Sequence, residues 1–275
     1  MIKDILVNLS SANGRDVTSD YALSVARTLD AHLTAVSFAV EPFVAGSMFD
    51  GVSASVVATL QAECEENAKA VSSRFEKSLQ GAGITAESRV IDATSAGVGD
   101  VFGRLARRYD MSIIAQPQND DPVQQLIVEG ALFGSGRPVL VVPYIQREGL
   151  TLNRVLLCWD GSRSAARAFA DAEPLLERSK KIDVITIASK DDNRGEISGA
   201  DIAHHLARHD LNVELKRIVA PDTDVPNTIL SYAADSSTDL IVMGGYGHSR
   251  LREFVLGGAT RGILSSMTVP TFLSH

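Results

Sequence analysis

Two glycine clusters mark the stretch of this chain that is best suited to chemistry, and nine residues separate them. An apolar run over 240–243 leads into the first cluster, which predicts a buried strand followed by a glycine-rich turn. The clusters consist of Gly244, Gly245 and Gly247, and then Gly257 and Gly258. Because glycine lets backbone N–H groups approach a ligand closely, the stretch 243–260 predicts an anion site, filled by a phosphorylated ligand.

Polar side chains within the same stretch offer further contacts. His248, Ser249, Arg250 and Arg252 follow the first cluster. Arginine or histidine at such a place could meet a phosphate, and the alternative is a solvated polar loop. We single out His248 and Ser249 as candidate ligand contacts.

An acidic turn follows another apolar run, at 155–159. It reads Asp160-Gly161-Ser162. Asp160 could contact a ligand at the end of a strand, or it could cap the helix that follows, and the two roles are compatible.

Other titratable groups give weaker signals. His205 and His209 are four residues apart and suit a metal ion, but with no clear third ligand a solvated helix face is the better interpretation. The thiol of Cys158 is best explained as a small core group. We therefore predict no metal site.

Composition limits the class of protein. The chain has 275 residues and a net charge of −8, which disfavours binding to nucleic acid or to an anionic membrane. Two cysteines form no disulfide framework, no apolar run is long enough to span a membrane, and the first residues enter a strand pattern at once. These features predict a soluble, cytoplasmic protein.

Strands and helices alternate along the whole chain, which predicts an α/β fold with helices on both faces of a parallel sheet. Each half should contribute five strands. In the first half we expect strands over 5–9, 33–40, 85–91, 111–115 and 138–143, with helices over 21–29, 53–79, 98–109 and 125–133. In the second half we expect strands over 155–159, 182–188, 212–219, 240–243 and 269–273, with helices over 165–178, 200–209, 225–234 and 258–266.

The two halves repeat one pattern. Residues 33–39 correspond to 182–188, residues 110–118 to 239–247, and residues 129–132 to 257–260. A repeat of this length indicates two copies of one domain, over 1–146 and 151–275. Such copies usually pack as an intramolecular pseudo-dimer, for which the apolar edge strand 138–143 is the natural contact; a further homodimer stays open.

These features resemble the universal stress protein family in its tandem, two-domain form. The family signature spaces its glycines as Gly244, Gly247 and Gly257 are spaced, and places an acid at the end of the first strand, as Asp160 is placed. The resemblance implies two Rossmann-like domains related to the adenine nucleotide alpha hydrolases. It also implies binding of ATP, with Mg²⁺ on its phosphates, and a role in stress response or regulation.

The resemblance also implies a set of contacts in the second half. Asp160 would meet the adenosine, the backbone of Ile187 the adenine, and Met243 and Gly244 the ribose. The phosphate cradle would contain Gly247, Gly257, Gly258 and Ala259. The family expects a hydroxyl residue where Gly258 stands, so Thr260, two positions on, is the candidate replacement.

The first half departs further from the signature. Ser10 replaces the acid, Ala115 and Gln118 replace two glycines, and Glu129 replaces a third. Because a glutamate would repel phosphate, we expect this half to have lost nucleotide binding.

The sequence contains no motif that indicates an enzyme of the classes considered. Neither a P-loop nor the pyrophosphate loop of adenylating enzymes is present, and no general base stands beside the glycines. We predict a nucleotide-binding protein without efficient catalysis. Slow ATP hydrolysis and a ligand-free interaction scaffold are the alternatives.

Overall fold

The computed structural model of the chain describes residues 1–10, 16–41, 54–80, 83–118, 121–188, 199–219, 225–245 and 258–275. Their contacts form two compact units. The first contains residues 2–137 and 147–149, and the second contains Met1, 138–146 and 150–275.

The first unit has a parallel sheet in the order β3-β2-β1-β4. The middle residues of its central strands are fully buried, with Leu6 and Ile113 at 0% exposure. The strands are β1 (Asp4–Asn8), β2 (His32–Glu41), β3 (Ala86–Thr94) and β4 (Met111–Ala115).

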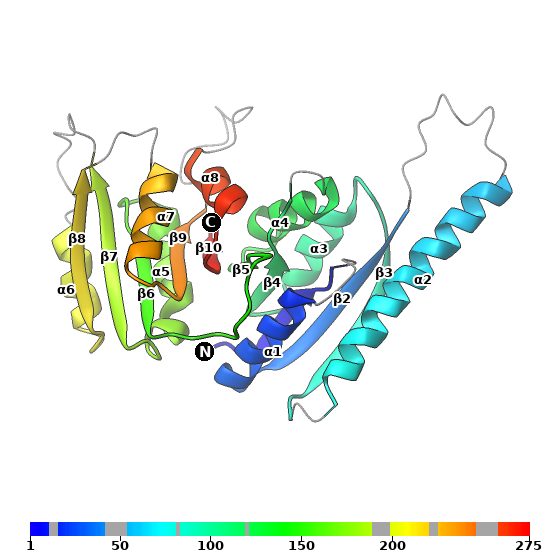
Figure 1. Ribbon diagram of the computed structural model, residues 1–275, viewed down its shortest axis with the longest axis horizontal. Helices are drawn as coiled ribbons and strands as arrows, with labels where there is room; N and C mark the ends of the chain where they lie inside the picture. Colours follow the sequence, from blue (N-terminus) through cyan, green and yellow to red (C-terminus); the bar gives the residue numbers. More distant parts are fainter. Residues whose placement is uncertain are drawn as a thin grey trace. The chain divides into compact units, whose positions relative to one another are not determined.

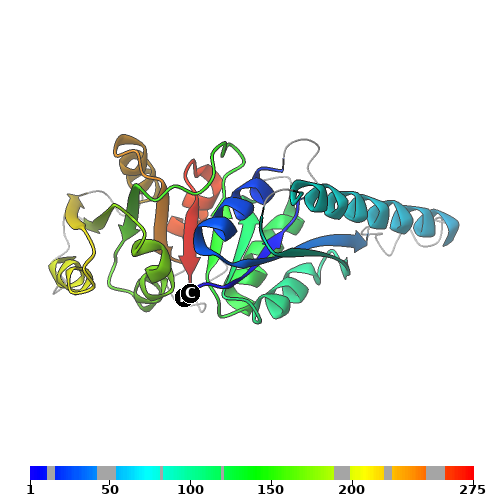
Figure 2. The same ribbon diagram turned by 90° about the horizontal axis from the view of Figure 1, so that it is seen from below.

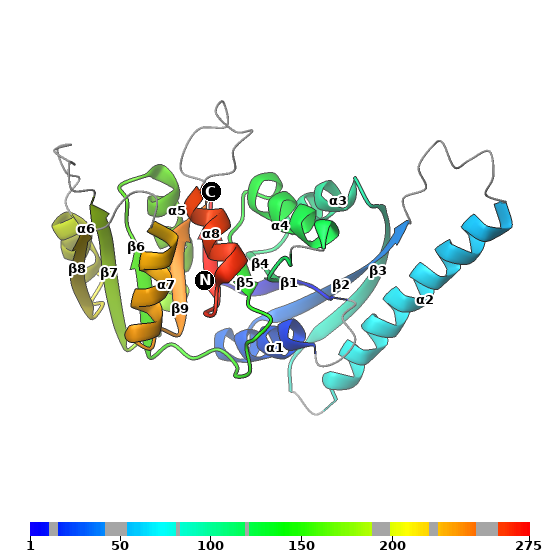
Figure 3. The ribbon, with the colours of Figure 1, turned by 45° about the horizontal axis from the view of Figure 1, so that its top comes forward.

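Four helices cover this sheet (Figure 3). They are α1 (Val17–Leu29), α2 (Ala54–Ser78), α3 (Val98–Ala106) and α4 (Pro122–Gly134). Right-handed crossovers place α1 and α2 on one face and α3 and α4 on the other. Figure 2 shows the same unit from below, with α2 lying along β2 and β3.

Helices α3 and α4 touch backbone to backbone through glycines spaced four residues apart. A Cβ added at Gly130 would lie 1.9 Å from the carbonyl oxygen of Gly99. A Cβ at Gly103 would lie 2.4 Å from the carbonyl oxygen of Gly130. The two helices can approach this closely only because both positions lack a side chain.

The second unit has the sheet order β5-β10-β9-β6-β7-β8. All neighbouring strands are parallel except β5, which runs antiparallel to β10 with Val141 opposite Thr271. The strands are β5 (Val139–Val142), β6 (Arg154–Cys158), β7 (Lys181–Ala188), β8 (Val213–Val219), β9 (Leu240–Gly244) and β10 (Thr271–Ser274).

Figure 1 shows α7 and α8 in front of this sheet and α5 and α6 behind it. The helices are α5 (Arg163–Leu176), α6 (Gly199–Ala207), α7 (Val225–Asp235) and α8 (Gly258–Ser266). No helix among the described residues is both long and apolar enough to cross a membrane.

An aspartate contact common to both units supports the repeat. In the first unit Asp110 accepts hydrogen bonds from the backbone N–H groups of Lys3 and Asp4, at 2.7 and 3.0 Å. In the second, Asp239 accepts from Asn153 and Arg154, at 2.6 and 2.9 Å. Each aspartate thus ties the start of its fourth strand to the start of the first, at positions that the sequence alignment pairs.

The predicted fold class is confirmed: the chain has an α/β fold with mostly parallel strands and helices on both faces. The predicted domain division at 146–151 differs from the compact units in one strand. By sequence β5 belongs to the first repeat, yet it pairs with β10 and falls within the second unit.

Candidate functional site

The candidate site lies where the strand order of the second unit reverses. Strand β6 has β7 on one side and β9 on the other, so the connections after β6 and β9 lead to opposite faces. In open parallel sheets, ligands bind in the crevice that such a reversal leaves at the carboxyl ends of the strands. Asp160 follows β6, Gly244 ends β9, and Gly258 begins α8.

Asp160 is exposed at this edge and also holds the turn that starts α5. Its Oδ1 accepts a hydrogen bond from the backbone N–H of Ser162 at 2.9 Å. Ser162 is the N-cap of α5, and its Oγ accepts from the N–H of Ala165 at 3.1 Å. The turn therefore uses one carboxylate oxygen of Asp160, and a ligand contact would use the other.

Gly244 is required by packing whether or not a ligand binds. A Cβ at this position would lie 2.6 Å from the backbone nitrogen of Ala165 and 2.7 Å from the carbonyl carbon and the Oγ of Ser164. The end of β9 thus rests directly on the first turn of α5. Met243, also predicted at the ribose, is 5% exposed and pairs with Leu273 in the sheet.

The N-terminus of α8 is open at its first residue. A Cβ added at Gly258 would meet no atom of the described residues within 4 Å, and this residue is exposed. Ala259 is half-buried, whereas Thr260 is 3% exposed and faces the core with Ile263.

Of the remaining predicted ligand contacts, only Ile187 belongs to the part of the chain that the structure describes. Ile187 is half-buried on β7 and pairs with Ile218 on β8. The residues that lie outside the described part of the chain are Gly247, His248, Ser249, Arg250, Arg252 and Gly257.

The corresponding place in the first unit is filled by a side chain of α4. Gln124 is 6% exposed, accepts a hydrogen bond from Nδ2 of Asn8 at 3.1 Å, and donates one to the carbonyl oxygen of Ala115 at 2.9 Å. Asn8 ends β1 and Ala115 ends β4, so Gln124 bridges the two strands that flank the reversal. Asp121 caps α4 and accepts from the N–H of Gln124.

Glu129 does not stand at a helix N-terminus, where its alignment with Gly257 placed it. It lies in the second half of α4, and its carboxylate accepts a hydrogen bond from Gln125 at 3.1 Å. The first unit therefore differs through an earlier helix start, at Pro122, rather than through a repulsive charge in a cradle.

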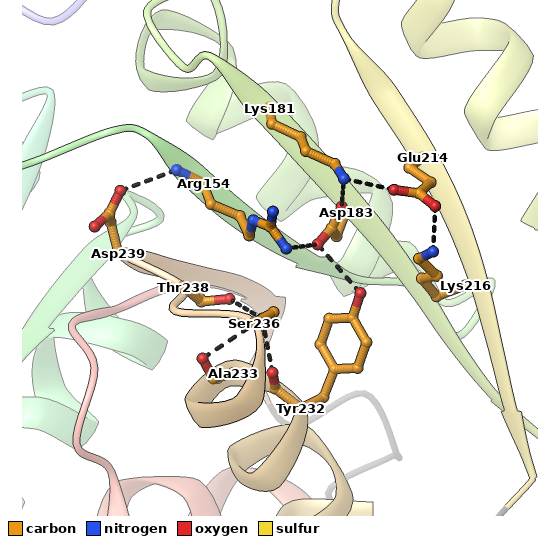
Figure 4. A network of polar contacts seen from close by, with 10 residues as sticks. All are labelled: Arg154, Lys181, Asp183, Glu214, Lys216, Tyr232, Ala233, Ser236, Thr238 and Asp239. Carbon is orange, nitrogen blue, oxygen red and sulfur yellow. Dashed lines mark hydrogen bonds and ion pairs between the residues drawn. The ribbon is translucent and has the colours of Figure 1, made fainter.

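A second polar cluster lies at the opposite, amino ends of the strands (Figure 4). Asp183 on β7 is 0% exposed. Its carboxylate lies 3.4 Å from Nη1 of Arg154 and 3.6 Å from Nζ of Lys181, and it accepts a hydrogen bond from the hydroxyl of Tyr232 at 3.1 Å. Two cations and one hydroxyl thus compensate a buried negative charge.

The cluster continues across to the edge strand β8. Hydrogen bonds from Lys181 and Lys216 lower the pKa of Glu214 to about 2. In the first repeat, Glu87 occupies the same register and bonds with Arg89 at 2.7 Å. Charges on an edge strand discourage pairing with another chain, so we assign these residues a structural role.

The histidines form an aromatic group between α5 and the end of α6. The ring centroids of His205 and His209 are 4.9 Å apart, and Phe169 packs edge-on against both. Nδ1 of His209 lies 3.3 Å from Glu173. Within the described ranges no three His, Cys, Asp or Glu residues are placed to hold a metal ion.

Cys158, at the end of β6, has no sign of an activated thiol. Burial, with a smaller contribution from the negative charge of Asp160, raises the pKa of Cys158 to about 12. The thiol therefore stays protonated at neutral pH and suits packing rather than nucleophilic chemistry.

Comparison with known proteins agrees with these observations. The model of the universal stress protein family matches residues 151–275. The universal stress protein Slr1230 of Synechocystis sp. is 25% identical over 212 residues, which cover 74% of this chain and 71% of that protein.

Solved structures show the same fold over the full length. A universal stress protein from Archaeoglobus fulgidus has a TM-score of 0.75 at 15% identity, over 98% of this chain and 96% of that one. A protein of unknown function from Pseudomonas aeruginosa has a TM-score of 0.62 at 15% identity, over 99% and 92%. The chain therefore carries a universal stress protein domain over residues 151–275, within a fold that it shares along its whole length with a universal stress protein of known structure.

Proposed function

We propose that this chain is a cytoplasmic stress-response or regulatory protein that binds ATP, or another adenine nucleotide, at the carboxyl edge of the sheet in its second unit. One nucleotide binds per chain. Asp160 faces the adenosine, Ile187 lies at the adenine, and the N-terminus of α8 faces the phosphates.

The contrast between the two units carries this proposal. Both have a reversal of strand order, which is where a parallel sheet takes a ligand. In the first unit the side chain of Gln124 lies at that place, where its amide oxygen and its amide nitrogen each make a hydrogen bond. In the second unit the same place has an exposed carboxylate, Asp160, and a helix that begins with an exposed glycine, Gly258.

The chemistry of the open edge suits a phosphorylated ligand. Backbone N–H groups in the first turn of a helix have no partner within the helix, and the helix dipole favours an anion there. The residues at this turn, Gly258 to Thr260, include no carboxylate. A Mg²⁺ ion would therefore be held by phosphate oxygens and water, as this ion commonly is.

Calorimetric titration with ATP and Mg²⁺ tests the proposal on the wild type and on Gly258→Asp. The aspartate has room, and its charge favours the start of a helix, so the fold should be as stable as before. The same charge repels phosphate, so affinity should fall about tenfold or more, given that charged hydrogen bonds are worth roughly 1.5–3 kcal/mol.

Ser265→Asp is the matched control, because Ser265 is exposed two turns further along the same helix. It adds the same charge away from the proposed phosphates and should leave affinity almost unchanged. Absence of binding heat with the wild type would sink the nucleotide proposal and favour a ligand-free scaffold. Rapid turnover of bound ATP would instead favour an ATPase.

A further inference from the structure

The carboxyl end of β10 holds the residue that follows β9. The N–H of Gly245 donates a hydrogen bond to the carbonyl oxygen of Ser274 at 2.7 Å. On the other side of the same residue, Nδ1 of His275 lies 2.9 Å from the carbonyl oxygen of Gly245. A carbonyl oxygen only accepts, so Nδ1 of His275 must carry a proton.

The last residue of β9, Gly244, and the residue that follows it, Gly245, are held by different elements. Gly244 rests on the backbone of Ser164 and Ala165 at the start of α5. Gly245 is buried and bonded to Ser274 and His275 at the end of β10. The end of β9 is thus held between α5 and β10, at the edge where the nucleotide is proposed to bind.

The first repeat fixes the end of its fourth strand in a comparable way. Gln124 donates a hydrogen bond to the carbonyl oxygen of Ala115, the residue that aligns with Gly244. There the donor comes from α4 and fills the crevice. In the second repeat the side chain that contacts the end of β9 comes from the residue after β10.

From this arrangement we infer that His275 is a positioning residue for the nucleotide site. It acts through Gly245: the imidazole fixes the end of β9 relative to Asp160 and the start of α8. The inference rests on the proposed nucleotide binding. No sequence motif singles out His275, because its role depends on the pairing of β9 with β10.

The experiment compares the wild type with His275→Ala and His275→Asn. The amide nitrogen of asparagine can donate from nearly the place of the imidazole Nδ1, whereas alanine cannot donate. Binding of ATP is followed by the fluorescence of Trp159, the single tryptophan, which directly precedes Asp160. One neutral hydrogen bond predicts an affinity loss of about five- to tenfold for His275→Ala.

His275→Asn should recover affinity to within about twofold, since the lost hydrogen bond is restored. Thermal unfolding of all three proteins separates this effect from a general loss of stability, since a positioning role predicts that affinity falls while the unfolding temperature of His275→Ala stays close to that of the wild type. Equal affinity of His275→Ala and the wild type, or failure of asparagine to restore affinity, would overturn the inference.

Nitrogen NMR of the imidazole in the free protein gives a readout that needs no ligand. A proton on Nδ1 at neutral pH supports the contact with Gly245, and a tautomer protonated only at Nε2 overturns it.

If the wild type binds no ATP, the proposed function fails and the positioning role fails with it. If the wild type binds ATP but the alanine variant binds equally well, only the role of His275 fails.

Discussion

Gln124 joins Asn8 to the end of β4 through its side-chain amide, accepting from Asn8 at 3.1 Å and donating to Ala115 at 2.9 Å. All three groups lie at the carboxyl edge of the first unit, where β1 separates β2 from β4. A ligand that displaced this buried side chain would have to replace both hydrogen bonds. The two repeats therefore share one fold and differ in the described side chains at the same place, Gln124 in the first and Asp160 in the second.

Replacing Gln124 by leucine should destabilise the protein. The leucine fills a similar volume, but the buried amide of Asn8 and the carbonyl of Ala115 lose their partner, which costs about 1–3 kcal/mol. Denaturant unfolding measures this change. Gln125→Leu is the control, because Gln125 is exposed on the same turn and should change stability by less than about 0.5 kcal/mol.

The same contact predicts the binding stoichiometry. Titration of the wild type with ATP should saturate at one nucleotide per chain, because the crevice of the first unit is filled. Two equivalent sites would contradict the role assigned to Gln124.

Asp160 should show two separable roles. Asparagine keeps the oxygen that accepts from Ser162 but removes the charge, whereas alanine removes both. We expect Asp160→Asn to retain the stability of the wild type and to weaken ATP binding about tenfold, the value of one charge-assisted hydrogen bond. Asp160→Ala should weaken binding at least as much and also lower stability by roughly 1 kcal/mol through the lost turn contact.

Calorimetry for binding and thermal unfolding for stability, measured on both variants, separate these roles. If Asp160→Asn bound ATP as tightly as the wild type, the aspartate would serve the turn alone.

Much of this organisation follows from sequence patterns. The alternation of strands and helices predicts the α/β fold, and the alignment of residues 110–118 with 239–247 pairs Asp110 with Asp239, whose contacts match in the structure. Sequence patterns do not predict the packing contacts of Gly244. Its place in the motif suggests a ligand, while the atoms that a Cβ there would meet belong to Ser164 and Ala165 of α5, far away in the sequence.

The sequence patterns do not single out Gln124, although a local signal is present. Asp121-Pro122 is a typical helix start, with an N-cap and a proline in the first turn, and it places the start of α4 before residue 125. The bonds of Gln124 with Asn8 and Ala115 were beyond local patterns, because they depend on the pairing of β1 with β4.

Gly130 and Gly134 on α4 should respond differently to the same substitution. A Cβ at Gly130 would lie 1.9 Å from the carbonyl oxygen of Gly99, whereas one at Gly134 would lie at an ordinary 3.6 Å from the Cα of Gly103. Gly130→Ala must push α3 and α4 apart, and overpacking of this kind costs about 1–3 kcal/mol or more. Gly134→Ala should be nearly neutral.

Denaturant unfolding of the two alanine variants measures the difference, with the same chemical change in both. Equal stability would mean that α3 and α4 do not approach as closely as the glycine contacts require.

Tyr232 should make stability depend on alkaline pH. Burial, followed by the negative charge of Asp183 and the hydrogen bond to it, raises the pKa of Tyr232 to about 12. In the unfolded chain a tyrosine titrates near pKa ~10, so the folded state retains this proton more strongly. The contribution of Tyr232 to stability is therefore complete below about pH 10 and is lost as the pH rises towards 12.

Tyr232→Phe lacks the titrating group. The difference in unfolding free energy between this variant and the wild type should therefore shrink between pH 8 and pH 11, as followed by denaturant unfolding. Tyr144→Phe is the control, because Tyr144 is 61% exposed. A difference between wild type and Tyr232→Phe that stays constant over this range would show that the hydroxyl of Tyr232 does not keep its proton through the contact with Asp183.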